Sequence, residues 1–218
     1  MHSAASKGVG SKQYGVSSKG FAPYFLLLTS LLILLTLTNC QSTAPVVKVG
    51  LVAPFEGRDR AIGYDAIYSA RLAVREINAA GGIGGYRIAL VALDDSGDPE
   101  LAQGTAESLV IDDNVVAVVG HWRPQTTAVA APIYASANLA FLAGGESPYQ
   151  PTDPADLEPD FIERYTAVTP FNEQPGPYAD PTYAAFQTLW QIFKDTNKHI
   201  GSINRGSVQQ TLQNSPPT

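Results

Sequence analysis

From Val46 onward, short continuous apolar runs alternate with stretches of helical periodicity. Such alternation is typical of βαβ units and predicts the α/β class: an open parallel sheet with helices on both faces. Five runs predict strands, at Val46–Val52, Tyr86–Leu93, Val115–Val119, Leu139–Ala143 and Phe161–Val168. Helices are predicted between them, over Arg60–Ala80, Pro99–Ile111, Gln125–Ala137 and Gly176–Lys194.

Turn and cap residues set the bounds of two of these helices. Gly81 and Gly82 follow Arg60–Ala80, and glycine readily takes the left-handed conformation that ends a helix. Asp98 precedes Pro99, which predicts a helix start, because Asp caps free backbone N–H groups and Pro has no N–H to lose. The helix Pro99–Ile111 is expected to bury four side chains: Leu101, Ala102, Thr105 and Leu109.

The C-terminal third is less regular. Pro148–Asp160 holds four prolines and four acidic residues, which predicts a long surface loop. In the helix Gly176–Lys194 an apolar stripe is expected to pack on the sheet; it comprises Tyr183, Phe186, Leu189, Trp190 and Phe193. Residues 200–218 are polar and without periodicity, so we predict an irregular tail.

The N-terminus has the pattern of an export signal. Lys7, Lys12 and Lys19 precede the uncharged run Phe21–Leu37. The segment Leu37-Thr38-Asn39-Cys40 resembles a bacterial lipobox, in which the cysteine is lipidated, although Asn39 stands where a small residue is usual. We therefore predict a signal peptide at 1–39, lipidation at Cys40, a tether at 40–45 and a binding lobe at 46–199. An uncleaved single-pass anchor is the alternative, and either one places the body outside the cytoplasm at a membrane.

Charge and cysteine content narrow the choice of partners. The formal net charge is −6, and it becomes −9 without the three lysines of the first 39 residues. An acidic body repels phosphate backbones, so nucleic acid is not an expected partner. With Cys40 as its single cysteine, the chain has no internal disulfide and depends on its hydrophobic core.

Several segments together resemble the leucine/isoleucine/valine-binding proteins of ABC importers. The segment most specific to that family is Glu76-Ile77-Asn78-Ala79-Ala80-Gly81-Gly82-Ile83-Gly84-Gly85. Matching segments occur in the same order around it: Val49–Pro54, Asp94-Asp95 with Asp98-Pro99, Val118–His121 and Pro132–Tyr134. The resemblance covers residues 46–199 and implies the periplasmic binding protein type I fold, represented here by its N-terminal lobe without the second lobe. A further strand is then expected near Lys198–Ile203.

The resemblance also implies ligand-binding positions. The family holds the ligand carboxylate at a Ser-rich turn that matches Trp122–Thr127 here, where Pro124 has no N–H to donate and Gln125 and Thr126 are expected to compensate. Arg123 is open to two interpretations, an anion-binding group or a solvated surface charge. The family's later positions match Gly145, Ser147 and Asn172, while Phe55, Glu56 and Ile62 match positions that border the cleft.

Trp122 is a candidate on its own grounds. It follows the carboxyl end of a predicted strand, where open α/β sheets bind ligands, and its ring could stack on a ligand there. The alternative is that Trp122 caps the end of the sheet.

These features predict a non-enzymatic receptor without a cofactor. The expected ligand is an amino acid, an amide or another small polar solute, and the expected partner is an ABC permease. Catalysis is a weaker reading, because His121 and His199 are too few for a zinc site and the chain has neither a Gly-x-Ser-x-Gly elbow nor a phosphate-binding loop. A non-functional gene fragment and a one-lobe sensor stay open as alternatives.

Overall fold

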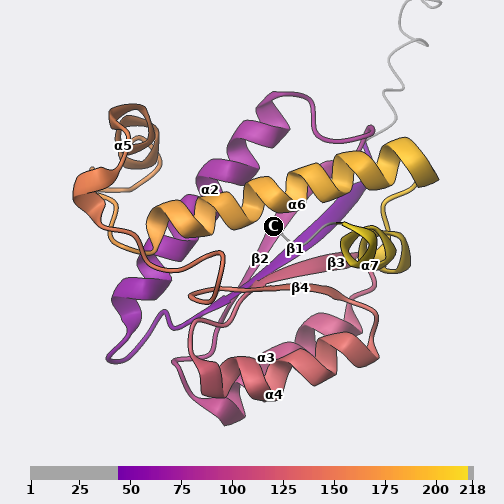
Figure 1. Ribbon diagram of the computed structural model, residues 1–218, viewed down its shortest axis with the longest axis horizontal. Coiled ribbons are helices and arrows are strands. Elements are labelled where there is room, and N and C mark those ends of the chain that lie inside the picture. Colours follow the sequence, from indigo (N-terminus) through magenta and orange to yellow (C-terminus); the bar gives the residue numbers. More distant parts are fainter. Residues whose placement is uncertain (1–43, 216–218) are drawn as a thin grey trace, which may run out of the picture. The chain divides into compact units, whose positions relative to one another are not determined.

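The computed structural model describes residues 44–215. Four strands and six α-helices alternate through most of this range (Figure 1). The strands are β1 (Val46–Ala53), β2 (Arg87–Asp94), β3 (Val115–Gly120) and β4 (Ala140–Ala143). The α-helices are α2 (Arg60–Ala79), α3 (Pro99–Ile111), α4 (Pro124–Ser136), α5 (Pro159–Thr166), α6 (Ala179–Ile200) and α7 (Arg205–Asn214), and a short 3-10 helix, η1, covers Pro154–Asp156.

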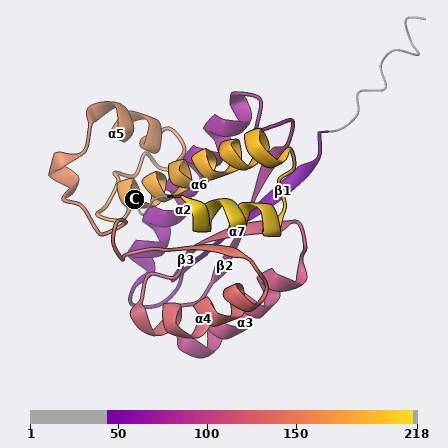
Figure 2. The same cartoon turned by 45° about the vertical axis from the view of Figure 1, so that its right-hand side comes forward.

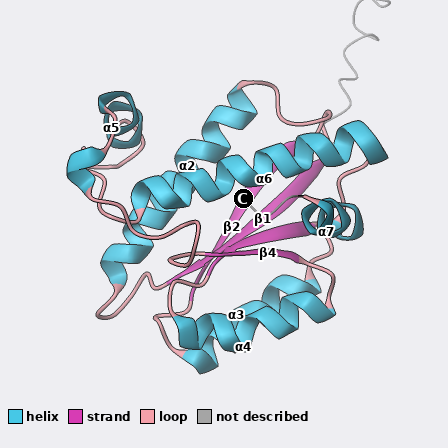
Figure 3. Cartoon of the chain, in the orientation of Figure 1, coloured by secondary structure: helices cyan, strands magenta, loops and turns pink. Residues whose placement is uncertain are grey.

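The strands form one parallel sheet in the order β2-β1-β3-β4, which confirms the predicted fold class. β1 and β3 are central, and their side chains are almost all buried, as expected of a parallel sheet covered on both faces. The order reverses between β1 and β3, because β1 continues to β2 on one side and β3 to β4 on the other (Figure 3). Such a reversal at the carboxyl ends of two central strands is where open α/β sheets bind their ligands.

Helices cover both faces of the sheet. α2, α6 and α7 lie on one face, and α3 and α4 lie on the other (Figures 1 and 2). The apolar stripe of α6 enters the first of these cores as predicted, with Phe186, Leu189, Trp190 and Phe193 all buried. The second core is smaller and includes Ala106 and Leu109 of α3.

Local signals set the ends of α2 and α3 much as the sequence predicts. Gly81 and Gly82 have φ of +101° and +81° directly after α2. The Asp98 carboxylate accepts hydrogen bonds from the backbone N–H groups of Glu100 and Leu101 at 2.8 and 3.0 Å. The burial expected of Leu101 is wrong: its side chain is 49% exposed, because the first turn of α3 extends past the edge of the core and Ala102 faces inward instead.

The fifth predicted strand, Phe161–Val168, is a helix instead. Pro159 occupies the first turn of α5, where its missing N–H costs no bond. Phe161 and Tyr165, four residues apart, are both buried on one face of this helix. Arg164 donates from Nε to Asp160 at 2.8 Å and from Nη1 to Glu76 of α2 at 2.7 Å, which fastens α5 to α2. The four-residue spacing therefore prevails over the β propensity of the aromatic residues.

The predicted irregular tail and the strand expected near Lys198–Ile203 are also replaced. α6 continues to Ile200, and Gly201, at φ +82°, ends it with its N–H bonded to the carbonyl of Asn197. Asn204 then starts α7 with a capping box shared with Ser207. Ile203 and Val208 are buried, so the polar segment contributes two apolar side chains to the core.

Arg205 fastens α7 to the end of the sheet opposite the carboxyl ends of its strands. Its guanidinium donates to the backbone carbonyl groups of Leu109, Val110, Asp112 and Val115, at the end of α3 and the start of β3. These carbonyl groups include several that the last turn of a helix leaves without partners.

The signal peptide predicted at 1–39, the lipidation site at Cys40 and the first part of the tether lie outside the described residues. Ala44 and Pro45, which end the predicted tether, are irregular, and Ala44 is exposed. Within residues 44–215, no helix is long and apolar enough to span a membrane.

Candidate functional site

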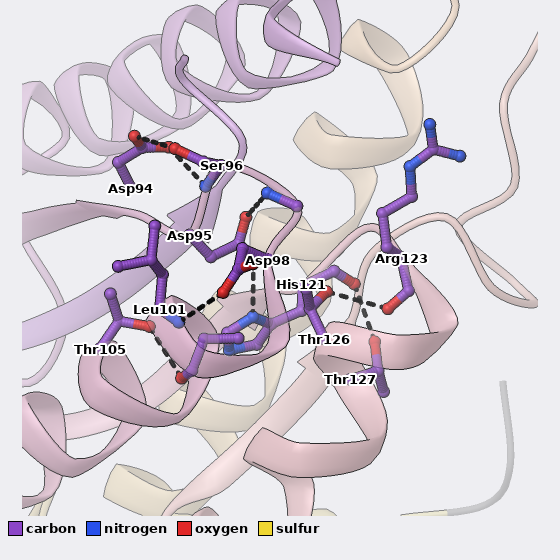
Figure 4. Close-up of polar contacts among 12 residues, drawn as sticks. Asp94, Asp95, Ser96, Asp98, Leu101, Thr105, His121, Arg123, Thr126 and Thr127 are labelled. Carbon is purple, nitrogen blue, oxygen red and sulfur yellow. Dashed lines mark hydrogen bonds and ion pairs between the residues drawn. The ribbon is translucent and has the colours of Figure 1, made fainter. Parts of the chain in front are cut away.

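The loops at the carboxyl ends of the strands form the candidate site. Residues 54–59 follow β1, residues 95–98 follow β2, and residues 121–123 follow β3. Because all four strands are parallel, these loops emerge at the same edge of the sheet (Figure 4). Residues that are far apart in the sequence thereby come into contact.

An ion pair joins the loops after β1 and β3. Arg123, which precedes α4, donates through Nε to Oδ2 of Asp59 at 2.9 Å and through Nη2 to Oδ1. Asp59 precedes α2, so the pair joins the N-cap residues of α2 and α4. The hydrogen bond from Arg123 lowers the pKa of Asp59, against the smaller opposing effect of burial, and the Arg123 and Arg58 charges lower it further. Both members are partly accessible, with 34% of the Arg123 side chain and 16% of the Asp59 side chain exposed.

Asp94 joins the loops after β1 and β2. Its Oδ1 accepts from the backbone N–H of Phe55 at 2.7 Å and from that of Ser96 at 2.8 Å, while Oδ2 accepts from the Ser96 hydroxyl. Burial raises the pKa of Asp94, but these hydrogen bonds outweigh it and leave the pKa below its ordinary value. Asp94 is therefore an anionic anchor for two loops, and both of its carboxylate oxygens already accept hydrogen bonds.

A buried polar chain joins the loops after β2 and β3. Oδ2 of Asp95 lies 2.7 Å from Nδ1 of His121, and Nε2 of His121 lies 3.0 Å from the hydroxyl of Tyr134 on α4. Oδ1 of Asp95 also accepts from the backbone N–H of Gly97. All three side chains are buried, and burial raises the pKa of Tyr134, with the Asp95 charge adding to the effect.

One proton arrangement satisfies every member of this chain. With a neutral imidazole, Nδ1–H donates to the Asp95 carboxylate and Nε2 accepts the hydroxyl proton of Tyr134. None of these three side chains reaches the surface, so their effect on the site is to position the loops at the strand ends.

Trp122 and Gly145, two of the predicted ligand-binding residues, lie beside each other. Trp122 is only 6% exposed, and its indole covers Gly144, where a Cβ would lie 2.4 Å from Cε2 of the ring. Gly145 has φ +76° and packs against the backbone and ring edge of Trp122. The Trp122 ring thus packs against Gly144 and Gly145 and presents little of its surface to solvent.

Gln125 and Thr126 both lie in the first turn of α4, beside Arg123. Gln125 is exposed, whereas Thr126 is fully buried and its hydroxyl donates to the carbonyl of Arg123 at 2.9 Å. The neighbouring Thr127 hydroxyl donates to the carbonyl of His121. Of these hydroxyl and amide groups, the Gln125 side chain is thus the one presented to solvent.

Ser147 and Asn172 are apart from this group. Ser147 is exposed and lines a groove at the outer edge of β4. Asn172 is exposed in the loop after α5, at φ +55°, and no hydrogen bond joins it to the other candidate residues in the described part of the chain. Of the cleft-border positions, Phe55 and Ile62 are largely covered and Glu56 is exposed.

The acidic side chains at this edge already have hydrogen-bond partners. Within residues 44–215, no group of three or more His, Cys, Asp and Glu side chains is placed to hold a metal ion. Asp94 and Asp95, at the end of β2, use their oxygens on backbone N–H groups, Ser96 and His121.

Comparison with known families adds the decisive observation. The model of the periplasmic binding protein family matches residues 46–159, which is more than half of the chain. The chain belongs to the periplasmic binding protein family. Proteins of this family bind solutes and are not enzymes, and the family implies an exported, periplasmic protein.

Several related proteins are named as binding proteins for amino acids. An amino acid binding protein of Pseudomonas aeruginosa is 36% identical over 107 residues, covering 49% of this chain and 29% of that protein. A Leu/Ile/Val-binding protein homologue of Brucella abortus is 30% identical over 140 residues, covering 63% of this chain and 36% of its own length. The chain thus spans about a third of the length of these curated relatives.

The fold is shared with solved amino-acid-binding proteins. The branched-chain amino acid transporter substrate-binding protein LivJ of Streptococcus pneumoniae, solved with isoleucine, has a TM-score of 0.61 at 15% identity, over 77% of this chain and 87% of that one. The leucine-binding protein LivK of Thermotoga maritima has a TM-score of 0.57 at 12% identity, with 76% and 87% covered. At such identities the likeness establishes the fold of this periplasmic binding protein and nothing about its ligand.

Sequence reasoning missed two features of the site. Asp59 was not a candidate, because nothing in its neighbourhood marks it as the partner of a residue 64 positions away. His121 was considered only as a zinc ligand, although it stands in the same matched family segment as β3. A histidine directly after a buried strand, with an Asp-Asp pair at the end of the strand that precedes it in the sequence, is the signal that would have suggested a buried pair.

Proposed function

We propose that this chain binds an amino acid, or a small polar solute similar to one, at the carboxyl edge of its sheet. The observation that carries the proposal is the partly exposed Arg123–Asp59 pair, which joins the loops after β1 and β3 where the strand order reverses. Open α/β sheets bind ligands at the carboxyl ends of strands at such a point.

The pair presents both charges that a zwitterion needs. Arg123 uses Nε and Nη2 on Asp59, and Nη1 makes no hydrogen bond within the described residues. A ligand carboxylate would accept from Nη1, because guanidinium groups bind carboxylates through several N–H groups in one plane. The ligand ammonium would lie against Asp59, whose lowered pKa keeps it ionised. Gln125, at the start of α4, adds an amide that can meet either group.

The rest of the edge supports a pre-formed site. The Asp94 anchor and the buried Asp95–His121–Tyr134 chain hold the loops from three strands together before any ligand arrives. Pre-organisation of this kind reduces the entropy lost on binding. The names of the Pseudomonas and Brucella relatives agree with an amino-acid ligand, and an amide or a small carboxylic acid is the alternative that the same groups would accept.

We further propose that the chain is the solute-receptor component of an ABC importer, held at the outer face of a membrane. The Phe21–Leu37 run and the lipobox-like segment ending at Cys40 support export and lipid attachment. A lipid anchor would keep the receptor close to its permease at high effective concentration. Substituting Cys40→Ser and following the chain by membrane fractionation and labelled-palmitate incorporation tests the anchor. Unchanged label and unchanged membrane association would contradict it.

A ligand screen tests the binding proposal directly. Amino acids, amides and small carboxylates are screened by thermal shift on the purified full chain, and each hit is measured by calorimetry. Arg123→Gln is expected to weaken binding about tenfold or more, since it removes a charged hydrogen bond worth about 1.5–3 kcal/mol. Arg75→Gln, on the exposed face of α2, is the matched control. Equal affinities for the two variants, or no hit in any of the three classes, would overturn the proposed site.

A further inference from the structure

Asp59 does not cap the helix that it precedes. It is the N-cap residue of α2, where an aspartate ordinarily accepts a hydrogen bond from a free backbone N–H of the first turn. Its side chain makes no such bond. Both carboxylate oxygens accept from Arg123 instead, which comes from the loop after β3. The carboxylate therefore serves the guanidinium, and α2 begins without a side-chain cap.

Arg123 lies where its own helix disfavours it. It is the N-cap residue of α4, at the positive end of the helix dipole, where a cation is unfavourable. Its side chain extends away from the buried His121 (Figure 4). A guanidinium beside a helix N-terminus is an arrangement that attracts anions. Asp59 supplies that anion from within the chain, so the edge carries a neutralised pair rather than an open cation.

A third loop holds the pair in place. Gly97, in the loop after β2, has φ +70°, and a Cβ on it would lie 3.5 Å from Oδ2 of Asp59 and 3.9 Å from Cγ of Arg123. The N–H of Gly97 donates to Asp95 at 2.9 Å, which fixes the loop. Arg58 reaches to 3.8 Å from Asp59, but its side chain is 89% exposed, so water screens its charge. All five residues lie within the part of the chain that the family model matches.

We propose that Asp59 determines the class of ligand: it selects zwitterionic amino acids over simple carboxylic acids. This inference rests on the proposed binding site at Arg123 and narrows the ligands that the site accepts. A simple carboxylate at Nη1 of Arg123 brings a second negative charge close to Asp59 and nothing to compensate it. An α-amino acid carries an ammonium group on the carbon next to its carboxylate, and that group meets Asp59. Selectivity then comes from repulsion of the wrong ligand as well as attraction of the right one.

Matched ligands test the selection on the unaltered protein. Each pair joins an amino acid to the acid that lacks only its ammonium group: leucine with 4-methylpentanoate, alanine with propanoate, and phenylalanine with 3-phenylpropanoate. Calorimetry on the purified full chain at pH 7 measures the Kd of each. We expect the amino acid of a pair to bind about tenfold tighter, or more, than its deaminated acid.

A variant then removes the charge alone. Asp59→Asn keeps the shape of the side chain and an oxygen that can accept from Arg123. It is expected to weaken amino-acid binding about tenfold and to tighten binding of the deaminated acids about fivefold, so that the preference of the parent chain is lost. Circular dichroism confirms that the variant is folded.

Asp112→Asn is the matched control. The Asp112 carboxylate accepts from Nζ of Lys48 at 2.6 Å, at the opposite end of the sheet, and that hydrogen bond lowers the pKa of Asp112. Both substitutions break one ion pair. If Asp59 only stabilised the fold, the two variants would therefore bind ligands alike. Asp112→Asn is expected to keep the preference of the parent chain for amino acids.

The outcomes separate two failures. If no ligand of either class binds the parent chain, the proposed binding site is wrong, and the selection by Asp59 is wrong with it. If amino acids bind and Arg123→Gln weakens them, but Asp59→Asn keeps the parent's preference, the site stands and the role of Asp59 is wrong. A deaminated acid that binds the parent chain as tightly as its amino acid would also contradict that role.

Discussion

His121 and Asp95, which follow different strands, form a buried pair at the carboxyl edge of the sheet. Their Nδ1 and Oδ2 atoms are 2.7 Å apart, and neither side chain has more than about 1% of its surface exposed. The Tyr134 hydroxyl is hydrogen-bonded to the second ring nitrogen of His121, Nε2. Because every polar atom of the imidazole has a partner, removing any one member leaves a buried polar group without a hydrogen bond.

We therefore expect His121→Phe to destabilise the protein by about 3 kcal/mol, because the Asp95 carboxylate would stay buried without its partner. Tyr134→Phe, which removes a single hydroxyl, is expected to cost about 1 kcal/mol. Urea unfolding followed by circular dichroism measures both values. If His121→Phe were as stable as the parent chain, the pair would not contribute to holding the loops.

The Arg123–Asp59 pair makes a pH-dependent contribution to stability. Its hydrogen bond lowers the pKa of Asp59 below the ordinary value of 3.8. The folded state thus binds the Asp59 proton less tightly than the unfolded state does. The stabilisation is then fully present above about pH 5 and is lost as the pH falls through the folded pKa, below about 4.

Asp59→Asn is accordingly expected to lower the free energy of unfolding by up to about 1 kcal/mol at pH 7, a figure reduced for the partial exposure of Arg123. The difference from the parent chain is expected to shrink as the pH falls below 3.8 and through the lowered pKa of folded Asp59. Urea unfolding at pH 7 and at a series of acidic pH values measures it. Asp156→Asn, at an exposed position, is the control. A difference that grew on acidification would contradict the assigned direction of the pKa shift.

The sheet and most of its helices could be predicted because their signals are local. Val115–Val119 is uninterrupted and apolar, and a run of that length has few alternatives to a buried strand. Asp98 caps α3 through its own side chain, so the helix start was predicted to the residue. Both features depend on neighbours within four positions in the sequence.

The errors occur where distant contacts decide the structure. Arg164 fastens α5 to Glu76, 88 positions earlier, and Arg205 binds carbonyl groups 90 or more positions away. The sequence pattern within 159–166 and 205–214 does not indicate these distant partners. The candidate site divides in the same way: Gln125 and Thr126 are adjacent in the sequence and lie together, whereas the placement of Ser147 and Asn172 depends on how the loops after β4 and α5 pack.

Arg205 provides a test of whether α7 is part of the folded body. Arg205→Ala is expected to destabilise the protein by about 2 kcal/mol, because backbone carbonyl groups at the end of α3 lose their donors. The stability of Arg205→Lys is expected to lie between that of the parent chain and that of Arg205→Ala, since a single ammonium cannot reach all four carbonyl groups. Arg58→Ala, at a side chain that is 89% exposed, is the control in the same urea titration. A loss no larger than that of the control would show that α7 does not stabilise the sheet.

Two glycines on either side of β2 are expected to respond to alanine in opposite ways. Gly82 has φ +81°, and a Cβ there would lie 2.0 Å from the backbone oxygen of Tyr86, so Gly82→Ala is expected to cost more than about 1 kcal/mol. Gly104 lies within α3 with open space around it, and Gly104→Ala is expected to add about 0.5–1 kcal/mol by reducing the freedom of the unfolded chain. Thermal unfolding of both variants beside the parent chain measures the two shifts. A stabilising Gly82→Ala would mean that the turn into β2 takes another conformation, and with it that the register of β2 against β1 differs from the one described.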